Sequence, residues 1–139
     1  MTASLTELKI GTVGDAMTPG ILTCLPVTPL RDVARMMATH RVHAIVVFGH
    51  EDTLLPWGVL SDLDLVGAID SGATAGAVAA SPIVTVTPGD SLLYAAQLMR
   101  EHSTTHVIVV ADESSPLPIG VLSTLDVARV FAAETTPEA

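Results

Sequence analysis

The stretch LPWGVLSDLD at residues 55–64 returns at residues 117–126 as LPIGVLSTLD, 62 residues further along the chain. Extended outward from this stretch, the alignment of residues 12–64 with residues 74–126 needs no gap, and 19 of its 53 positions are identical. Unrelated segments of this composition would share about four. The sequence therefore contains one structural unit twice, which is more typical of a binding or sensing module than of an enzyme.

Each copy is predicted to contain three short strands rich in Val, Ile and Leu, the composition expected of strands buried on both faces. The strands are Ile21–Leu25, Ala44–Phe48 and Trp57–Leu60 in the first copy, and Ile83–Thr87, Val107–Ala111 and Ile119–Leu122 in the second. The polar segments Gly49–Thr53 and Asp112–Pro116 join the second and third strands as hairpins.

Two helices complete each copy. The first helix follows the first strand and carries apolar residues three and four apart, which place one stripe on one face; these residues are Leu30, Val33, Ala34 and Met37, and Leu92, Ala95, Ala96 and Met99. Thr28 and Asp90 stand at the expected helix starts. The second helix is expected over Asp62–Asp70 and Thr124–Ala133, and the connector Ser71–Ser81 includes a short helix.

A unit of this size has too much surface for its own core, so we expect the two copies to pack together. The predicted fold class is α/β (α+β): two tandem β-α-β-β-α repeats, at residues 8–70 and 71–134, packed about a pseudo-twofold axis. Residues 135–139 form a frayed tail. Clefts between the copies are the natural ligand sites.

Composition excludes several classes of function. Fifteen acidic and six basic residues give a formal net charge of −9, and neither basic clusters nor aromatic platforms are present, so we expect no nucleic-acid partner. The apolar runs are strand-sized and far below the roughly 20 residues of a membrane-spanning helix. The absence of a secretion signal and the single cysteine, Cys24, predict a cytoplasmic protein.

Three sets of residues carry a resemblance to a known family. They are the segment DAMTP at residues 15–19, the helix PLRDVARMM at residues 29–37, and the ending Gly-apolar-apolar-Ser-x-x-Asp of both copies. In their order, spacing and duplication they resemble the CBS-domain family, as a stand-alone tandem pair (a Bateman module) over nearly the whole chain. The chain departs from the family at Val46 and Ile108, where a proline is common.

The resemblance implies a regulatory ligand in the inter-repeat clefts: AMP, ADP, ATP, S-adenosylmethionine or a cyclic dinucleotide. Asp64 and Asp126 would hold the ribose hydroxyls, with Ser61 and Ser123 beside them. The base would be lined by Val59, Val121, Ile21, Leu22, Ile83, Val84, His43, Ala44, Thr105 and His106. These residues are not assigned to individual clefts. The resemblance also implies a homodimer, and a regulated enzyme or transporter as partner.

The Ser-x-x-Asp endings have a structural interpretation as well. Ser and Asp three residues apart at a helix start have the spacing of a capping box, and a carboxylate suits the positive end of the helix. The two roles can coexist, because the cap can hold Ser in place for a ligand. His43 and His106, at strand starts, are candidates for a phosphate or pH-sensitive contact. The acids of the hairpin loops, Asp112 and Glu113 among them, would make a polyphosphate tail a poorer ligand.

No catalytic motif is present, neither a nucleophile elbow nor a phosphate loop nor a metalloprotease helix, so the chain is predicted not to be an enzyme. The preferred hypothesis is a sensor of adenosine ligands that needs no cofactor and signals to a partner. The alternatives are a structural dimer or partner-binding subunit without a nucleotide, and a metal- or redox-linked sensor that uses Cys24.

Overall fold

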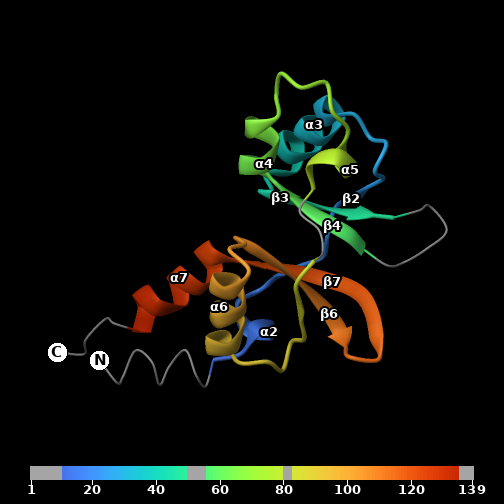
Figure 1. The fold of residues 1–139 in the computed structure, drawn as a ribbon. Helices are drawn as coiled ribbons and strands as arrows, with labels where there is room; N and C mark the ends of the chain where they lie inside the picture. Colours follow the sequence, from blue (N-terminus) through green and yellow to red (C-terminus); the bar gives the residue numbers. More distant parts are fainter. Residues whose placement is uncertain (1–10, 50–55, 80–82, 135–139) are drawn as a thin grey trace. The chain divides into compact units, whose positions relative to one another are not determined.

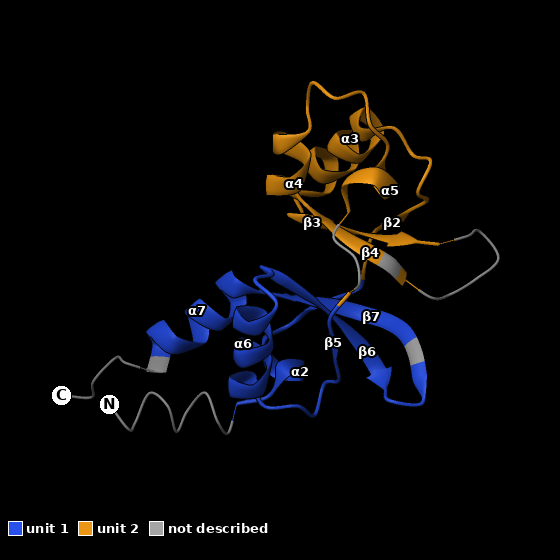
Figure 2. Ribbon diagram, viewed as in Figure 1, with its two compact units in different colours: residues 1–20, 84–139 blue, residues 21–83 orange. Residues whose placement is uncertain are grey.

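The computed structural model describes residues 11–49, 56–79 and 83–134. The chain forms two compact units (Figure 2): unit 1 comprises Met1–Gly20 and Val84–Ala139, and unit 2 comprises Ile21–Ile83. Each unit contains one copy of the strand, helix, strand, strand, helix order, so the prediction of a mixed α/β fold built from two such copies is confirmed.

Unit 2 is a three-stranded sheet with helices packed against it (Figure 1). Its elements are β2 (Thr23–Cys24), α3 (Leu30–His40), β3 (Ala44–Phe48), β4 (Pro56–Ser61), α4 (Asp62–Gly67) and α5 (Ala75–Val78). The strand order is β2-β3-β4, parallel between β2 and β3 and antiparallel between β3 and β4. The helix-facing core consists of Val33, Met37, Ile45, Val47, Leu60, Leu65 and Ala75.

Unit 1 repeats this plan with one additional strand. Its elements are α2 (Val13–Ala16), β1 (Thr18–Pro19), β5 (Thr85–Val86), α6 (Leu92–Glu101), β6 (His106–Asp112), β7 (Ser115–Ser123) and α7 (Thr124–Glu134). The strand order is β1-β7-β6-β5, and only the β5–β6 pair is parallel. The core consists of Val13, Val86, Leu92, Ala95, Met99, Val107, Val109 and Leu122.

The segment that leads into each copy packs with the other copy. In unit 1, Val13 N donates to Asp90 O and Gly14 N donates to Pro88 O, both at 2.9 Å. In unit 2, Ala75 N donates to Thr28 O at 2.9 Å and Gly76 N donates to Pro26 O at 2.8 Å. These bonds join equivalent positions of the two copies, so the compact units divide the chain differently from the sequence copies 8–70 and 71–134.

The predicted elements differ from the observed ones mainly at their ends. The first strands shorten to two residues, because β2 and β5 pair with β3 and β6 over only that length. Strands β6 and β7 extend to a tight turn at Glu113 and Ser114. The predicted short helix of the connector is α5. The first hairpin loop beyond Gly49, residues 8–10 and the tail 135–139 lie outside the described residues.

The predicted helix starts are shifted by one residue. Helix α3 has Pro29 as its N-cap, and Ser91 caps α6 through a hydrogen bond from Tyr94 N to Ser91 Oγ. Thr28 and Asp90 stabilise the preceding turns instead. Leu25 N donates to Thr28 Oγ1 at 3.1 Å, and Thr87 N donates to Asp90 Oδ2 at 2.8 Å.

Candidate functional site

In both units the start of the second strand meets the start of the second helix. In unit 2, Ala44 pairs with Ser61, and Asp62 N donates to His43 O at 2.9 Å. We call this place, formed by His43, Ala44, Ser61, Asp62 and Asp64, the corner of unit 2. The hairpin register brings these residues together because β3 begins where β4 ends.

The same arrangement recurs in unit 1. His106 pairs with Ser123, and Thr124 N donates to Thr105 O at 2.9 Å. Thr105, His106, Ser123, Thr124 and Asp126 form the corner of unit 1. The structure thus gathers eight of the fourteen predicted ligand residues into two equivalent corners, four in each.

Both Ser-x-x-Asp endings are capping boxes, as their spacing predicted. Asp64 N donates to Ser61 Oγ at 3.1 Å, and Ser61 N donates to Asp64 Oδ2 at 3.0 Å. In unit 1 the corresponding distances, for Ser123 and Asp126, are 3.1 and 2.9 Å. Each carboxylate is therefore fixed at its corner by the backbone, with one oxygen committed to the cap.

Four of the predicted base-lining residues lie beside the second strand of each copy: Val59 and Val121 in β4 and β7, and Leu22 and Val84 directly before β2 and β5. Val46 pairs with Val59, and Val46 N donates to Leu22 O at 2.9 Å. The equivalent residues of unit 1 make the same contacts: Ile108 pairs with Val121, and Ile108 N donates to Val84 O at 2.9 Å. Alternation along the strands puts Val59 and Val121 on the face opposite the helix-facing core.

The last two, Ile21 and Ile83, are half-buried and precede Leu22 and Val84 in the chain. Ile83 is the last residue of unit 2, although Val84 belongs to unit 1.

The two corners differ in their histidines. His43 Nδ1 lies 2.9 Å from Asp62 Oδ2, and both side chains are exposed. His106 is buried, and its Nδ1 lies 2.9 Å from Thr105 Oγ1. Sequence reasoning singled out both histidines but missed the pairing of His43 with Asp62, which are 19 residues apart and meet only through the hairpin.

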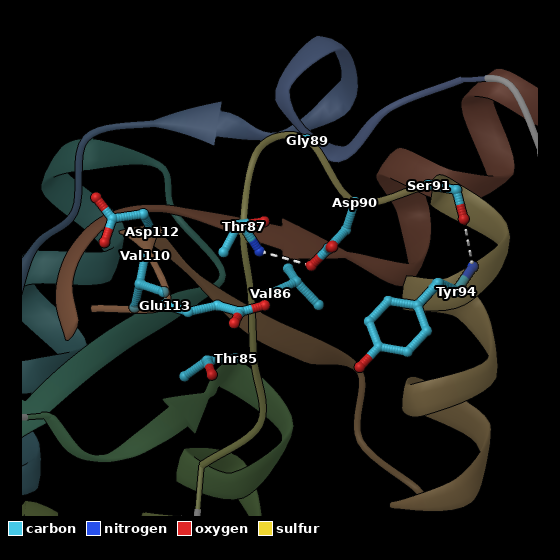
Figure 3. Close-up of a pocket in the computed structure, with 10 residues that line it drawn as sticks. All are labelled: Thr85, Val86, Thr87, Gly89, Asp90, Ser91, Tyr94, Val110, Asp112 and Glu113. Carbon is cyan, nitrogen blue, oxygen red and sulfur yellow. Dashed lines mark hydrogen bonds between the residues drawn. The ribbon is translucent and has the colours of Figure 1, made fainter. Parts of the chain in front are cut away.

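A cavity of about 710 Å³ opens elsewhere in unit 1, and Figure 3 shows the side chains around it. It is lined by Thr85, Val86, Thr87, Gly89, Asp90, Ser91, Tyr94, Val110, Asp112 and Glu113. None of the fourteen predicted ligand residues is among them, since the cavity lies at the far end of β6 from His106. Asp112 and Glu113 therefore border this cavity and not the corner of unit 1. Hydrogen bonds from Ser114 lower the pKa of the Asp112 carboxyl.

Cys24 is half-buried in β2, and burial raises the pKa of its thiol, an effect that a hydrogen bond with Thr28 only partly offsets. A raised pKa makes the reactive thiolate scarcer. Across residues 11–49, 56–79 and 83–134, no three His, Cys, Asp or Glu side chains are grouped so that they could hold a metal ion. In the same ranges, no helix combines the length and the apolar character needed to cross a membrane.

Comparison with known proteins agrees with this architecture. The family model described as CBS domain matches residues 13–71 and again residues 75–133. A search of curated proteins finds no match. Among solved structures, the CBS domain pair of protein MJ0100 in complex with 5′-methylthioadenosine and S-adenosyl-L-methionine superposes with a TM-score of 0.80 at 16% identity. That alignment covers 91% of this chain and 99% of the CBS domain pair of MJ0100.

Two further structures are more similar in sequence. CBSX2 in complex with AMP has a TM-score of 0.65 and 27% identity, over 88% of this chain and 97% of its own. The CBS domain protein PAE2072 from Pyrobaculum aerophilum, complexed with AMP, has a TM-score of 0.70 and 26% identity, over 88% and 98%. With two matched domains that together span most of its length, the chain belongs to the CBS domain family, as a tandem pair.

Proposed function

We propose that this CBS domain pair is a regulatory module that binds an adenosine nucleotide of the AMP type at its corners. The observation that carries the proposal is the retention of the same Ser and Asp pair, in the same capping geometry, in both copies. The AMP complexes of CBSX2 and PAE2072 support the choice of ligand, since both proteins are similar to this chain over nearly its whole length.

The chemistry of the corners suits a ribose. A carboxylate is the usual partner of vicinal ribose hydroxyls, and the cap leaves the second oxygen of Asp64 and of Asp126 able to accept further hydrogen bonds. Val59 and Val121, two residues before the capping Ser, supply apolar surface for the base. The other predicted residues, Ile21, Leu22, Ile83, Val84 and the strand starts, complete the proposed site.

The proposed role is sensing without catalysis. Ligand binding would favour one arrangement of the CBS pair over others, and a regulated enzyme or transporter would respond to that change. The single cysteine supports a cytoplasmic setting. The half-buried Cys24, with its raised pKa, gives the alternative of redox sensing little support.

AMP is expected to raise the melting temperature of the chain, and at 100 times its dissociation constant to add about 2.7 kcal/mol to stability. Asp126→Asn and Asp64→Asn should each weaken binding at their own corner by about tenfold, because the single amide oxygen stays with the cap and the NH2 group that then faces the ribose cannot accept a hydrogen bond. Thermal unfolding measures the rise in melting temperature, and isothermal titration calorimetry measures the affinities of the variants. Asn can still accept the hydrogen bond of the cap, so stability without ligand should change little.

Asp112→Asn is the matched control, since it removes a carboxylate outside both corners and should leave AMP binding unchanged. If AMP, ATP, S-adenosylmethionine and adenosine all fail to shift the melting temperature, the proposed function is wrong. If AMP binds and both corner variants bind it normally, the ligand lies elsewhere.

A second role, as a homodimer that presents its helices to another copy, is supported by exposed apolar side chains. Leu63 in α4 is 71% exposed, and Leu125 at the equivalent position of α7 is 51% exposed. Val66 and Phe131 on the same two helices are exposed as well. Exposed apolar surface repeated in both copies is typical of an interaction surface.

Sedimentation velocity tests the homodimer. The wild type is expected to sediment as a dimer, and Leu63→Glu or Leu125→Glu should shift it toward the monomer, because a charge would be buried at the interface. Val27→Glu is the control, since Val27 is 74% exposed but lies outside these helices. A wild type that remains monomeric at the highest concentration reached would contradict the dimer.

A further inference from the structure

The two corners carry different charges, and the first difference is the residue that begins the second helix. Asp62 begins α4 and Thr124 begins α7. The two residues occupy the same place, because the backbone N–H of each donates to the strand-start carbonyl, of His43 and Thr105 respectively, at 2.9 Å. The corner of unit 2 therefore has a carboxylate where the corner of unit 1 has a hydroxyl.

The carboxylate of Asp62 is held at its corner. Its Oδ2 lies 2.9 Å from His43 Nδ1, while its side chain remains 53% exposed. It stands two residues before Asp64, whose own carboxylate is fixed by the cap. The corner of unit 2 thus presents two carboxylates from the first turn of one helix.

A second difference also makes the corner of unit 2 more negative than the corner of unit 1. In unit 1 the guanidinium of Arg129 lies 3.6 Å from Asp126 Oδ1 and offsets its charge. The equivalent position in unit 2 is Gly67, the last residue of α4, which has no side chain to do so. The corner of unit 1 therefore combines the carboxylate of Asp126 with a guanidinium. The corner of unit 2 has two carboxylates, one of them in contact with the imidazole of His43, and a glycine in place of the arginine.

From these differences we infer that Asp62 makes the corner of unit 2 select against a phosphate, so that the two corners take adenosine ligands of different charge. The corner of unit 1 accepts an adenosine monophosphate. The corner of unit 2 takes an adenosyl compound whose 5′ substituent is neutral or cationic. The inference rests on the proposed function, because it assumes that an adenosyl group binds at both corners.

The expected size of the effect follows from Coulomb's law. An ionised phosphate carries a charge of about −1.5 to −2 at neutral pH. One additional carboxylate at about 8 Å, in a medium with a dielectric constant of about 50, between the values for a protein surface and for water, weakens the binding of such a group by about tenfold. Salt reduces this penalty, because the separation is comparable to the Debye length of about 10 Å at 0.1 M.

Titration calorimetry with AMP and with adenosine, at pH 8 and low salt, tests the inference on the full chain. The wild type is expected to bind one AMP at least tenfold more tightly than a second. Asp62→Thr, which gives unit 2 the residue of unit 1, should strengthen the weaker AMP site about tenfold. The affinity for adenosine, which lacks the phosphate, should stay the same.

The reverse exchange, Thr124→Asp, is the matched variant and should weaken the tighter AMP site about tenfold. Asp62→Asn keeps the size of the side chain and should act in the same direction as Asp62→Thr, which guards against a variant that folds poorly. At 0.5 M salt the effect of Asp62→Thr on AMP should fall to less than about threefold.

Three results would count against the inference, and they can be told apart. Two equal AMP sites in the wild type would show that the corners do not discriminate. An equal change in AMP and adenosine affinity on Asp62→Thr would show that Asp62 acts on the shape of the corner and not through its charge. Absence of binding by both AMP and adenosine would overturn the proposed function, and the inference with it.

Discussion

Replacing Leu122 by alanine is expected to lower the free energy of unfolding by about 2–5 kcal/mol. Leu122 lies in β7, is 0% exposed, and packs in the helix-facing core of unit 1 with Val13, Leu92 and Met99. Truncation removes buried methyl groups and leaves a cavity. The close-packed side chains around it relax only partially, so the cavity persists. Urea denaturation followed by circular dichroism measures the loss.

The chain provides its own controls for this prediction. Leu60 occupies the equivalent position in unit 2 and is also 0% exposed, so Leu60→Ala should lower stability by a similar amount. Leu117→Ala removes the same atoms from a side chain that is 43% exposed and lies outside the helices of the proposed dimer, and should change stability by only about 0.5 kcal/mol. A Leu122→Ala variant as stable as Leu117→Ala would contradict the described core.

The fold was predictable because the duplication supplies each element twice. The strand Ala44–Phe48 has the same bounds in the prediction and in the structure, since its apolar run ends at Gly49. The first strands were predicted too long, because apolar residues continue beyond the part that pairs. In unit 2 the ladder with β3 consists of Thr23 and Cys24, which pair with Val46 and Val47. Strand length depends on the neighbouring strand, which composition alone does not reveal.

The candidate site was predictable where its chemistry is local. The capping boxes join residues three apart, so their spacing in the sequence was sufficient to find them. The contact between His43 and Asp62 joins two segments that only the β3–β4 register brings together. The cavity was missed for the same reason, since its lining combines β5, the start of α6 and the end of β6.

The packing of the leading segments could not be read from the sequence, because the duplication makes two arrangements equivalent. Gly14 and Gly76 are equivalent positions, and so are Pro26 and Pro88. The leading helix of each copy could therefore bond to the turn of its own copy, as Gly14 to Pro26, or to the turn of the other copy, as Gly14 to Pro88. The structure uses the second arrangement, in which Gly76 N donates to Pro26 O and Gly14 N donates to Pro88 O.

Gly76→Ala is expected to destabilise the chain by about 1–3 kcal/mol, the usual cost of overpacking. A Cβ at this position would lie 2.6 Å from Pro26 Cβ and 3.0 Å from Pro26 Cα, and neither atom belongs to a flexible side chain that could move aside. The preference of alanine for helices, up to about 1 kcal/mol, would offset only part of this penalty. Urea denaturation measures the net change.

Two other glycines make this result specific to the contact with Pro26. Gly14 holds the equivalent place in unit 1, but its Cβ would lie 3.2 Å from the nearest Pro88 atoms, so Gly14→Ala should cost much less than Gly76→Ala. A methyl group added at Gly67 in α4 would meet no atom within 4 Å, so Gly67→Ala should be neutral or stabilising. If Gly76→Ala is as stable as Gly67→Ala, α5 does not rest on Pro26, and the leading segments do not pack across the copies.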